Sequence, residues 1–263
     1  MLIDVHSHLY FPQFKEDFED VLERAKKAGV VSILCSGVDQ ESNEKVLELS
    51  RKYEIIKASL GIYPLDAVGL GHYDDVPREN RNFDVDAAIK FIEKNKKDCF
   101  AIGEVGLDYS PEGNCKEKEQ KEVFWKAIKL AEKLKKPLVV HTRKAEKDCL
   151  DILESSKLKN VVLHCFTGNL KLVKRAEDIG FYFSIPTIIT RLKHFQEVVG
   201  RTSLNNILTE TDAPYLSASK NGRSEPSHIK ETINIIAKIK KITVDETEKI
   251  IFSNYQKVFL KNF

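Results

Sequence analysis

A short apolar run near the amino terminus, "LIDVHSHLY" (residues 2–10), carries two histidines separated by one serine. Side chains at positions i and i+2 of a strand point to the same face, so His6 and His8 can aim at one point where the strand gives way to a loop. Such a pair can bind a metal ion, but it can equally cap the strand or face solvent. The pair alone does not distinguish these interpretations, so other residues must.

Four further ionisable side chains fall at or near the ends of apolar, β-branched runs. They are Glu104 in the fourth run, His141 in the fifth, His164 in the sixth and Asp212 in the eighth. With the first pair included, four of the seven histidines occupy such positions. In a barrel of parallel strands these ends form one face, and active sites are built there. We therefore expect the six side chains to converge.

Convergence of four imidazoles and two carboxylates would be costly without a cation. Protonated histidines would repel one another, and neutral ones would leave buried nitrogens without donors. One or two divalent metal ions resolve this conflict. Nitrogen and oxygen donors without thiolate suit Zn, Mn, Fe or Co, and they accept Mg where carboxylate and water dominate. A polar rim without an ion is the alternative.

The elements that must position these residues alternate between apolar runs and amphipathic helical stretches. Nearly continuous apolar runs are typical of parallel strands covered on both faces, and they occupy residues 2–6, 30–37, 55–62, 100–106, 137–143, 160–166, 181–186 and 206–212. Helical patterns occupy residues 18–29, 40–53, 84–95, 121–136, 145–156 and 170–180. Eight runs in this alternation predict a (β/α)8 TIM barrel. A doubly wound sheet is the alternative, but the Gly-rich turn typical of it does not follow the first run.

The last 37 residues, 227–263, read as two helices, with Thr243 and Glu246 forming a capping box at the second. The barrel therefore carries an additional C-terminal helix. One long polar connection, residues 69–83, follows the third run. A length of 263 residues fits one barrel domain spanning 1–263.

Composition limits the class of protein and its partners. Forty-two Lys plus Arg against 40 Asp plus Glu leave a formal net charge of +2, which excludes a strongly basic body that holds duplex DNA by electrostatics alone. No apolar stretch approaches the roughly 20 residues of a membrane span. The first residues do not resemble a secretory signal. Five cysteines without a CxxC pair suggest reduced thiols in the cytoplasm.

Five ordered motifs carry a family resemblance: "DVHSHL" (4–9), "AIGEVGLDY" (101–109), "PLVVHTRKA" (137–145), "HCFTG" (164–168) and "LTETDAPYL" (208–216). With the "EP" at 225–226, they resemble the motifs of the TatD family of metal-dependent deoxyribonucleases, within the amidohydrolase-like barrels. The resemblance covers most of the chain. It implies a TIM barrel, a centre of one or two metal ions, and hydrolysis of phosphodiester bonds in DNA, often from the 3′ end.

The resemblance also implies roles for the six side chains. His6 and His8 would bind a first metal with Asp212, and Glu104 would bridge to a second metal held by His141 and His164. Both ions would polarise a phosphoryl oxygen and lower the pKa of a bound water. Asp212 is the candidate for orienting that water and accepting its proton. The expected ions are Mg, Mn or Zn.

One stretch departs from the family pattern. The family commonly shows a "GxHPH"-like segment after the third strand, whereas this chain has "GIYPLDA", which puts Tyr63 and Leu65 where histidines are expected. The histidines at those positions are associated with holding substrate, so the departure concerns substrate preference more than the metals. Tyr63 can donate a hydrogen bond to a phosphate, or it can simply pack.

Other positions carry weaker signals. Arg143 matches the family's "HxR" and can pair with a phosphate oxygen. Arg223, beside Glu225 in "GRSEP", is a further substrate contact or part of a structural ion pair. Asp108 and Asp4 are candidates to orient metal ligands. We interpret four remaining residues as solvated, structural or core positions: His72, His194, His228 and Trp125.

The leading functional hypothesis is a cytoplasmic metal-dependent hydrolase acting on DNA, a 3′ exonuclease on single strands. End binding at a metal-lined mouth needs no long basic groove, which suits the near-neutral charge. The alternatives are hydrolysis of an ester such as D-aminoacyl-tRNA or of a small phosphoester, and a metal-binding scaffold without activity. Relatives that cleave other bonds often carry a carboxylated lysine where this chain has Glu104, which favours the phosphodiester.

Overall fold

The eight apolar runs form eight parallel strands in a computed structural model of the chain, which describes residues 1–70, 84–111, 113–220 and 222–260. Each strand pairs with the next one in the sequence, in the order β1 to β8. The strands are β1 Leu2–Ser7, β2 Val30–Ser36, β3 Ile56–Leu60, β4 Cys99–Asp108, β5 Leu138–Arg143, β6 Val161–His164, β7 Tyr182–Pro186 and β8 Ile207–Glu210.

The barrel closes where β1 meets the segment that directly follows β8. The Asp212 backbone N–H donates to the His6 carbonyl at 2.9 Å, and the His8 N–H donates to the Ala213 carbonyl at 2.7 Å. Inside the barrel wall, the Thr209 hydroxyl donates to the Ile3 carbonyl at 2.7 Å. The predicted TIM barrel is therefore confirmed.

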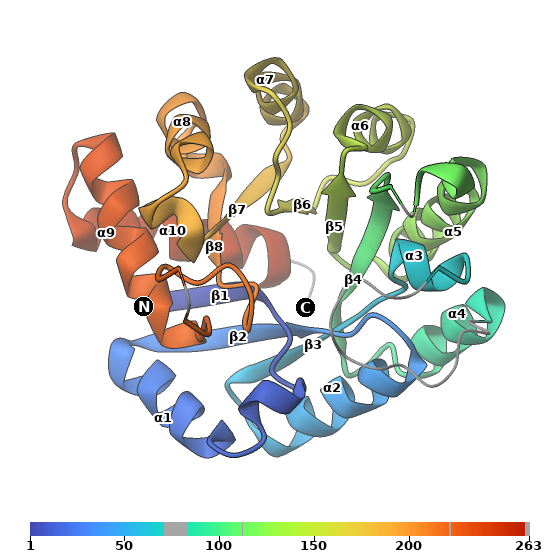
Figure 1. Cartoon of the computed structure of the whole chain (residues 1–263), viewed down its shortest axis with the longest axis horizontal. Helices are drawn as coiled ribbons and strands as arrows, with labels where there is room; N and C mark the ends of the chain where they lie inside the picture. The colour runs from blue at the N-terminus through green and yellow to red at the C-terminus, as the bar shows by residue number, and fades with distance from the viewer. Residues whose placement is uncertain (71–83, 112, 221, 261–263) are drawn as a thin grey trace.

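Helices surround the strands as an outer ring, which Figure 1 shows in a view into the barrel. Their bounds are α1 Phe18–Ala28, α2 Gln40–Lys52, α3 Pro64–Ala67, α4 Val85–Lys94, α5 Glu117–Leu134, α6 Glu146–Glu154, α7 Leu170–Ile179, α8 Lys193–Arg201, α9 Ile229–Lys240 and α10 Val244–Tyr255. Short 3-10 turns lie at Pro12–Phe14, Asn114–Lys116, Thr187–Thr190, Leu204–Asn206 and Pro226–His228, and a π-helical turn lies at Gln256–Leu260.

The strands are buried on both faces, as their continuous apolar character predicts. Every residue of β1 and β8 is buried, and so is almost every residue of β4. Alternate side chains point to the barrel interior and to the helices, so most strand residues are shielded from water on both faces, whereas Val31 near the start of β2 is exposed. This rigid wall presents its carboxyl ends as a single face.

Two parts of the sequence pattern differ from the structure. The sixth and eighth strands are shorter than the predicted runs, so Asp212 stands two residues beyond the end of β8. It has a positive φ of 53°, a conformation of loops and not of strands. A helix that our ranges did not include, α8, lies between β7 and β8 and completes the βα alternation.

The additional C-terminal helix, α10, begins with the predicted capping box. The Thr243 hydroxyl accepts from the Glu246 N–H at 3.2 Å, and the Glu246 carboxylate accepts from the Thr243 N–H at 2.9 Å. Near the end of this helix, the Asn254 side-chain amide donates to the Ile207 carbonyl at 2.9 Å. The helix is therefore fastened to the start of β8.

Replacing Phe259 by Ala tests whether this end of the chain belongs to the same cooperative unit as the barrel. Phe259 is 1% exposed and stacks on Phe100 with ring centroids 5.8 Å apart. We expect a loss of about 3–5 kcal/mol in the free energy of unfolding, because a buried aromatic leaves a cavity. Chemical denaturation measures this loss. An unchanged midpoint would contradict it, and two separate transitions in the wild-type chain would contradict the prediction of one domain over 1–263.

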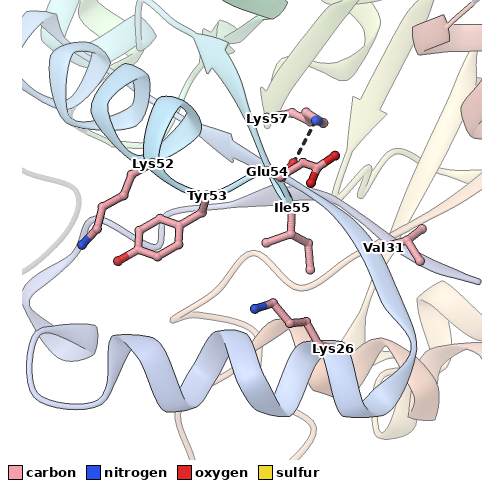
Figure 2. A pocket seen from close by; sticks show the side chains of 7 residues that line it. All are labelled: Lys26, Val31, Lys52, Tyr53, Glu54, Ile55 and Lys57. Atoms are coloured by element: carbon pink, nitrogen blue, oxygen red, sulfur yellow. Dashed lines mark hydrogen bonds between the residues drawn. The ribbon is translucent and has the colours of Figure 1, made fainter.

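A pocket lies on the opposite face of the barrel, near the amino ends of β2 and β3 (Figure 2). It is lined by Lys26, Val31, Lys52, Tyr53, Glu54, Ile55 and Lys57. Two of its lysines face carboxylates, since Lys26 lies 3.0 Å from Glu23 and Lys52 lies 3.8 Å from Glu19. This pocket is remote from the six predicted side chains.

The five cysteines are all free thiols. In the part of the chain that the structure describes, none of the helices combines the length and the apolar character needed to span a bilayer.

Candidate metal centre

The six predicted side chains converge at the carboxyl ends of the strands. They form three overlapping groups in which one nitrogen or oxygen atom per residue lies within 4.8 Å of the others. The groups are His6, His164 and Asp212; His6, His8 and Glu104; and Glu104, His141 and His164. Residues from the first, fourth, fifth and sixth strands and from the loop after β8 therefore meet at one place.

The HxH pair and Asp212 make one half of the cluster. Asp212 Oδ1 lies 3.5 Å from His6 Nε2 and 3.5 Å from His8 Nε2. The two Nε2 atoms are only 3.2 Å apart. The backbone hydrogen bonds that close the barrel between β1 and β8 hold these three residues together.

Glu104 stands between two pairs of histidines. Its Oε2 lies 3.4 Å from His6 Nε2 and 3.5 Å from His8 Nε2. Its other oxygen, Oε1, lies 2.7 Å from His141 Nδ1 and 3.1 Å from His164 Nε2. Each carboxylate oxygen thus faces one pair of imidazoles, which is the arrangement that a bridging ligand requires.

Glycines let the backbone approach closely enough to place Glu104 and His141. A Cβ on Gly61, just after β3, would lie 2.3 Å from the Glu104 backbone nitrogen. A Cβ on Gly106 in β4 would lie 2.0 Å from the His141 carbonyl, and Gly106 has a φ of +147°. Any larger residue would clash with the neighbouring backbone. These two glycines therefore set the position of the ligand candidates on β4 and β5.

The outer nitrogens of two histidines donate to fixed acceptors. His8 Nδ1 donates to the Ser36 carbonyl at 2.9 Å, and His141 Nε2 donates to Asp108 Oδ2 at 3.1 Å. A hydrogen on the outer nitrogen leaves a lone pair on the inner one. Because these lone pairs point into the cluster, the donor set fits a divalent cation.

Two contacts near the cluster were missing from our sequence reasoning. The Ser36 hydroxyl lies 3.1 Å from His6 Nδ1, so the end of β2 orients both members of the HxH pair. Glu210, fully buried, places Oε1 3.7 Å from His164 Nδ1 and accepts from the Cys165 N–H at 2.9 Å. Glu210 lies within the motif "LTETDAPYL", and this position could have identified it as a contact of the cluster. For Ser36, the sequence offered only its position at the end of a predicted strand.

Charges in the cluster favour ionised carboxylates. Burial alone would raise the pKa of Glu104, but His164 and His141 outweigh it and hold this pKa well below the usual value. Burial and the charge of His164 lower the pKa of His6 to about 4. Contacts with Asp108 and Glu104 outweigh burial at His141 and raise its pKa to about 9. The cluster therefore holds negative carboxylates ready for a cation, and protons compete with that cation at His141.

Asp108 and Asp4 hold different parts of the site. Asp108 contacts the His141 ring, as predicted. Asp4 instead accepts from the backbone N–H groups of His6, at 3.3 Å, and of Thr211, at 3.0 Å. It therefore orients the main chain of β1 and of the segment that leads to Asp212, and not an imidazole.

The three predicted substrate contacts lie in different surroundings. Arg143, half-buried, ends β5 two residues after His141. Burial and the charges of Glu104 and Asp108 raise the pKa of Tyr63 well above its usual value, and the charge of Arg143 partly opposes that rise. The Tyr63 hydroxyl donates to Asp108 at 3.1 Å. A phosphate contact by either residue stays a prediction.

Arg223 belongs to an ion-pair network between α1 and the loop after β8. Its guanidinium contacts both oxygens of Asp17, at 2.8 and 2.6 Å, and lies over the Phe14 ring at 4.5 Å. Arg24 joins Asp17 to Glu225, with its Nη2 2.9 Å from the first and 2.7 Å from the second. The structural ion pair that the sequence left open is therefore present.

Replacing Arg223 by Ala separates this structural role from substrate binding. The network is partly exposed, so we expect a loss of about 1 kcal/mol in the free energy of unfolding. KM for a short substrate should stay within twofold of the wild-type value, because the guanidinium is engaged by Asp17. A several-fold rise in KM with unchanged stability would instead support the predicted substrate contact.

The remaining singled-out residues are away from the cluster or outside the described part of the chain. His72 lies outside the described residues. His194 is on α8 and contacts the Phe166 carbonyl at 3.2 Å, and His228 ends a 3-10 turn and accepts from the Glu225 N–H at 3.3 Å. The expectation that Trp125 is a core residue was wrong. It is 37% exposed under Lys129, because the neighbouring Phe124 and Ile128 take the buried face of α5.

Comparisons with known proteins agree with this fold. The chain matches the TatD related DNase family over residues 3–260. It is 36% identical to human deoxyribonuclease TATDN3 over 99% of this chain and 95% of that protein. It is 34% identical to the uncharacterized metal-dependent hydrolase YabD of Bacillus subtilis over 100% of both chains.

A solved structure shows the same fold. The TatD homologue YJJV from Escherichia coli K12 superposes with a TM-score of 0.85 at 24% identity, covering 98% of this chain and 97% of that one. Family membership favours an active hydrolase over the inactive scaffold. The chain belongs to the TatD family of metal-dependent hydrolases.

Proposed function

We propose that this hydrolase cleaves phosphodiester bonds in DNA with one or two divalent ions held by His6, His8, Glu104, His141, His164 and Asp212. One observation carries the proposal: the Glu104 carboxylate lies between two pairs of imidazoles, with one oxygen toward each pair. Four imidazole nitrogens and two carboxylates form a donor set for Zn or Mn, and for Mg where carboxylate and water dominate.

The chain's own residues have distinct tasks in this reaction. Divalent ions bound here would neutralise phosphate charge and lower the pKa of water. A hydrogen bond with His8 and the charge of His164 outweigh burial and lower the pKa of Asp212, which keeps this carboxylate ionised and able to accept a proton. Glu104 fixes the spacing of the two histidine pairs. Arg143, which ends β5 two residues after His141, would pair with a phosphate oxygen.

We further propose that the substrate is the 3′ end of a single strand. The relative TATDN3 is named a deoxyribonuclease. The net charge of +2 supports binding of an end over binding along a duplex, because a long contact with phosphates needs many cations. The cytoplasmic location predicted from the sequence remains a prediction.

Labelled DNA substrates test this function. The metal-free chain, reloaded separately with Mg, Mn or Zn, is assayed on single- and double-stranded DNA carrying a 5′ label. We expect shortening from the 3′ end of single strands, loss of cleavage with a chelator, and recovery on adding back the ion. If the protein is shown to contain metal and still cleaves no DNA, the proposal is rejected.

Hydrolysis of a carboxylic ester, such as that of D-aminoacyl-tRNA, is a second candidate, and the segment after β3 favours it. Leu65 is 1% exposed and packs with Val38 and Tyr63, so a buried apolar side chain stands where family members commonly have a histidine that holds substrate. Comparing a nitrophenyl phosphodiester with a nitrophenyl ester separates the two reactions. A kcat/KM that is higher for the ester would favour this second function.

A further inference from the structure

Tyr63 is held rigidly beside the proposed metal centre. It precedes α3, where its N–H donates to the Val38 carbonyl at 2.9 Å and its carbonyl accepts from the Ala67 N–H at 3.0 Å. The ring is 7% exposed and packs with Val38 and Leu65. Its edge meets His141, with ring centroids 5.1 Å apart. Both the backbone and the ring therefore fix where the hydroxyl points.

The hydroxyl shares one carboxylate oxygen with His141. Asp108 Oδ2 accepts from the Tyr63 hydroxyl at 3.1 Å and from His141 Nε2 at 3.1 Å. The other oxygen, Oδ1, accepts from the Ser110 N–H at 2.8 Å. Asp108 is fully buried, so these three donors determine how its carboxylate is oriented.

We propose that Tyr63 is a positioning residue for His141, acting through Asp108, and that it sets the affinity of the centre for the ion held by His141. This inference rests on the proposed metal centre. A carboxylate that accepts a hydrogen bond from the outer nitrogen of a histidine ligand fixes the ring and increases its basicity. The Tyr63 hydroxyl adds a second donor to that carboxylate, which limits its rotation and keeps Oδ2 directed at the outer nitrogen of His141.

The chemistry of Tyr63 suits this role. A phenol keeps its hydrogen at neutral pH, and the Tyr63 hydroxyl donates that hydrogen to Asp108 at 3.1 Å. Its single hydrogen is directed to Asp108 and not into the mouth. A role in positioning therefore predicts an effect on ion binding, whereas a role in phosphate contact predicts an effect on KM alone.

The variant Tyr63→Phe removes the hydroxyl and keeps the ring. Metal-free chain is titrated with Mn²⁺ alone by calorimetry, and His141→Ala identifies which binding event belongs to the ion held by His141. In Tyr63→Phe we expect that event to weaken about tenfold, within the range known for outer partners of ligands. The other event should stay within twofold of wild type.

Tyr109→Phe is the matched control. Tyr109 also donates to an aspartate at 3.1 Å, but that aspartate is Asp148, away from the cluster. Its loss should leave both binding events unchanged. Circular dichroism and thermal melting of each variant report whether it has folded.

A double variant tests whether the effect passes through Asp108. In an Asp108→Asn background, Tyr63→Phe should cause less than a twofold further change, because the connecting carboxylate is already gone. Unchanged Mn²⁺ binding in the single variant would overturn the inference, and so would full additivity in the double variant. A wild-type chain that binds no Mn²⁺, Mg²⁺ or Zn²⁺ would instead overturn the proposed function, and this inference with it.

Discussion

Replacing Asp212 by Asn should lower kcat for DNA cleavage by about 10³-fold, which corresponds to about 4 kcal/mol of lost transition-state stabilisation. Asn has nearly the same size as Asp, but it cannot accept the proton of water and is a weaker ligand. Asp212 Oδ1 lies 3.5 Å from the inner nitrogens of both His6 and His8, so the loss of charge falls at the centre of the site.

The fold should survive this change. The structural contacts of Asp212 run through its backbone, which donates to the His6 carbonyl. Single-turnover cleavage measures kcat, and thermal melting checks folding. Asp178→Asn is the control, because Asp178 is exposed on α7 and pairs with Lys174. A rate within tenfold of wild type would show that another group accepts the proton.

Replacing Glu104 by Gln should have an equally large effect, because it removes a carboxylate that faces both pairs of histidines. Its oxygens lie 2.7 Å from His141 Nδ1 and 3.4 Å from His6 Nε2. Gln has the same shape as Glu but no charge. It would therefore not offset the positive charge of two divalent ions held by the histidine pairs on either side of it. We expect the number of bound divalent ions to fall by at least one and cleavage to fall by about 10³-fold or more.

Elemental analysis and calorimetry with Mn²⁺ measure this stoichiometry directly. Glu154→Gln is the matched control, since Glu154 pairs with Arg175 on the outer helices. If Glu104→Gln bound as many ions as wild type, with the same affinity, Glu104 would not be the bridging ligand. The proposed centre would then need a different bridging ligand.

Much of the fold was predictable because its signals are local. Continuous apolar runs separated by amphipathic stretches predicted parallel strands and their order, and a capping box predicted the start of α10. Element ends were less predictable. The loop conformation of Asp212 depends on backbone hydrogen bonds to β1, which is more than 200 residues away in the sequence.

Burial of single residues was also hard to predict from local pattern. Trp125 and Phe124 are adjacent on the same amphipathic helix, yet Phe124 is 1% exposed and Trp125 is 37% exposed. Which of two neighbouring aromatics faces the strands depends on how the whole helix is rotated against the barrel, and that rotation is set by packing and not by residue type.

The sequence by itself determined which residue types stand at the carboxyl ends of the strands, and hence that a cluster of imidazoles and carboxylates would form there. Only the tertiary structure decided how they are oriented: that Glu104 turns one oxygen to each pair of histidines, that Ser36 and Glu210 contact outer nitrogens, and that Tyr63 points to Asp108. The reason is physical. Strand periodicity assigns a side chain to a face, whereas its hydrogen-bond partners come from other strands, whose distance and angle are set by closure of the barrel.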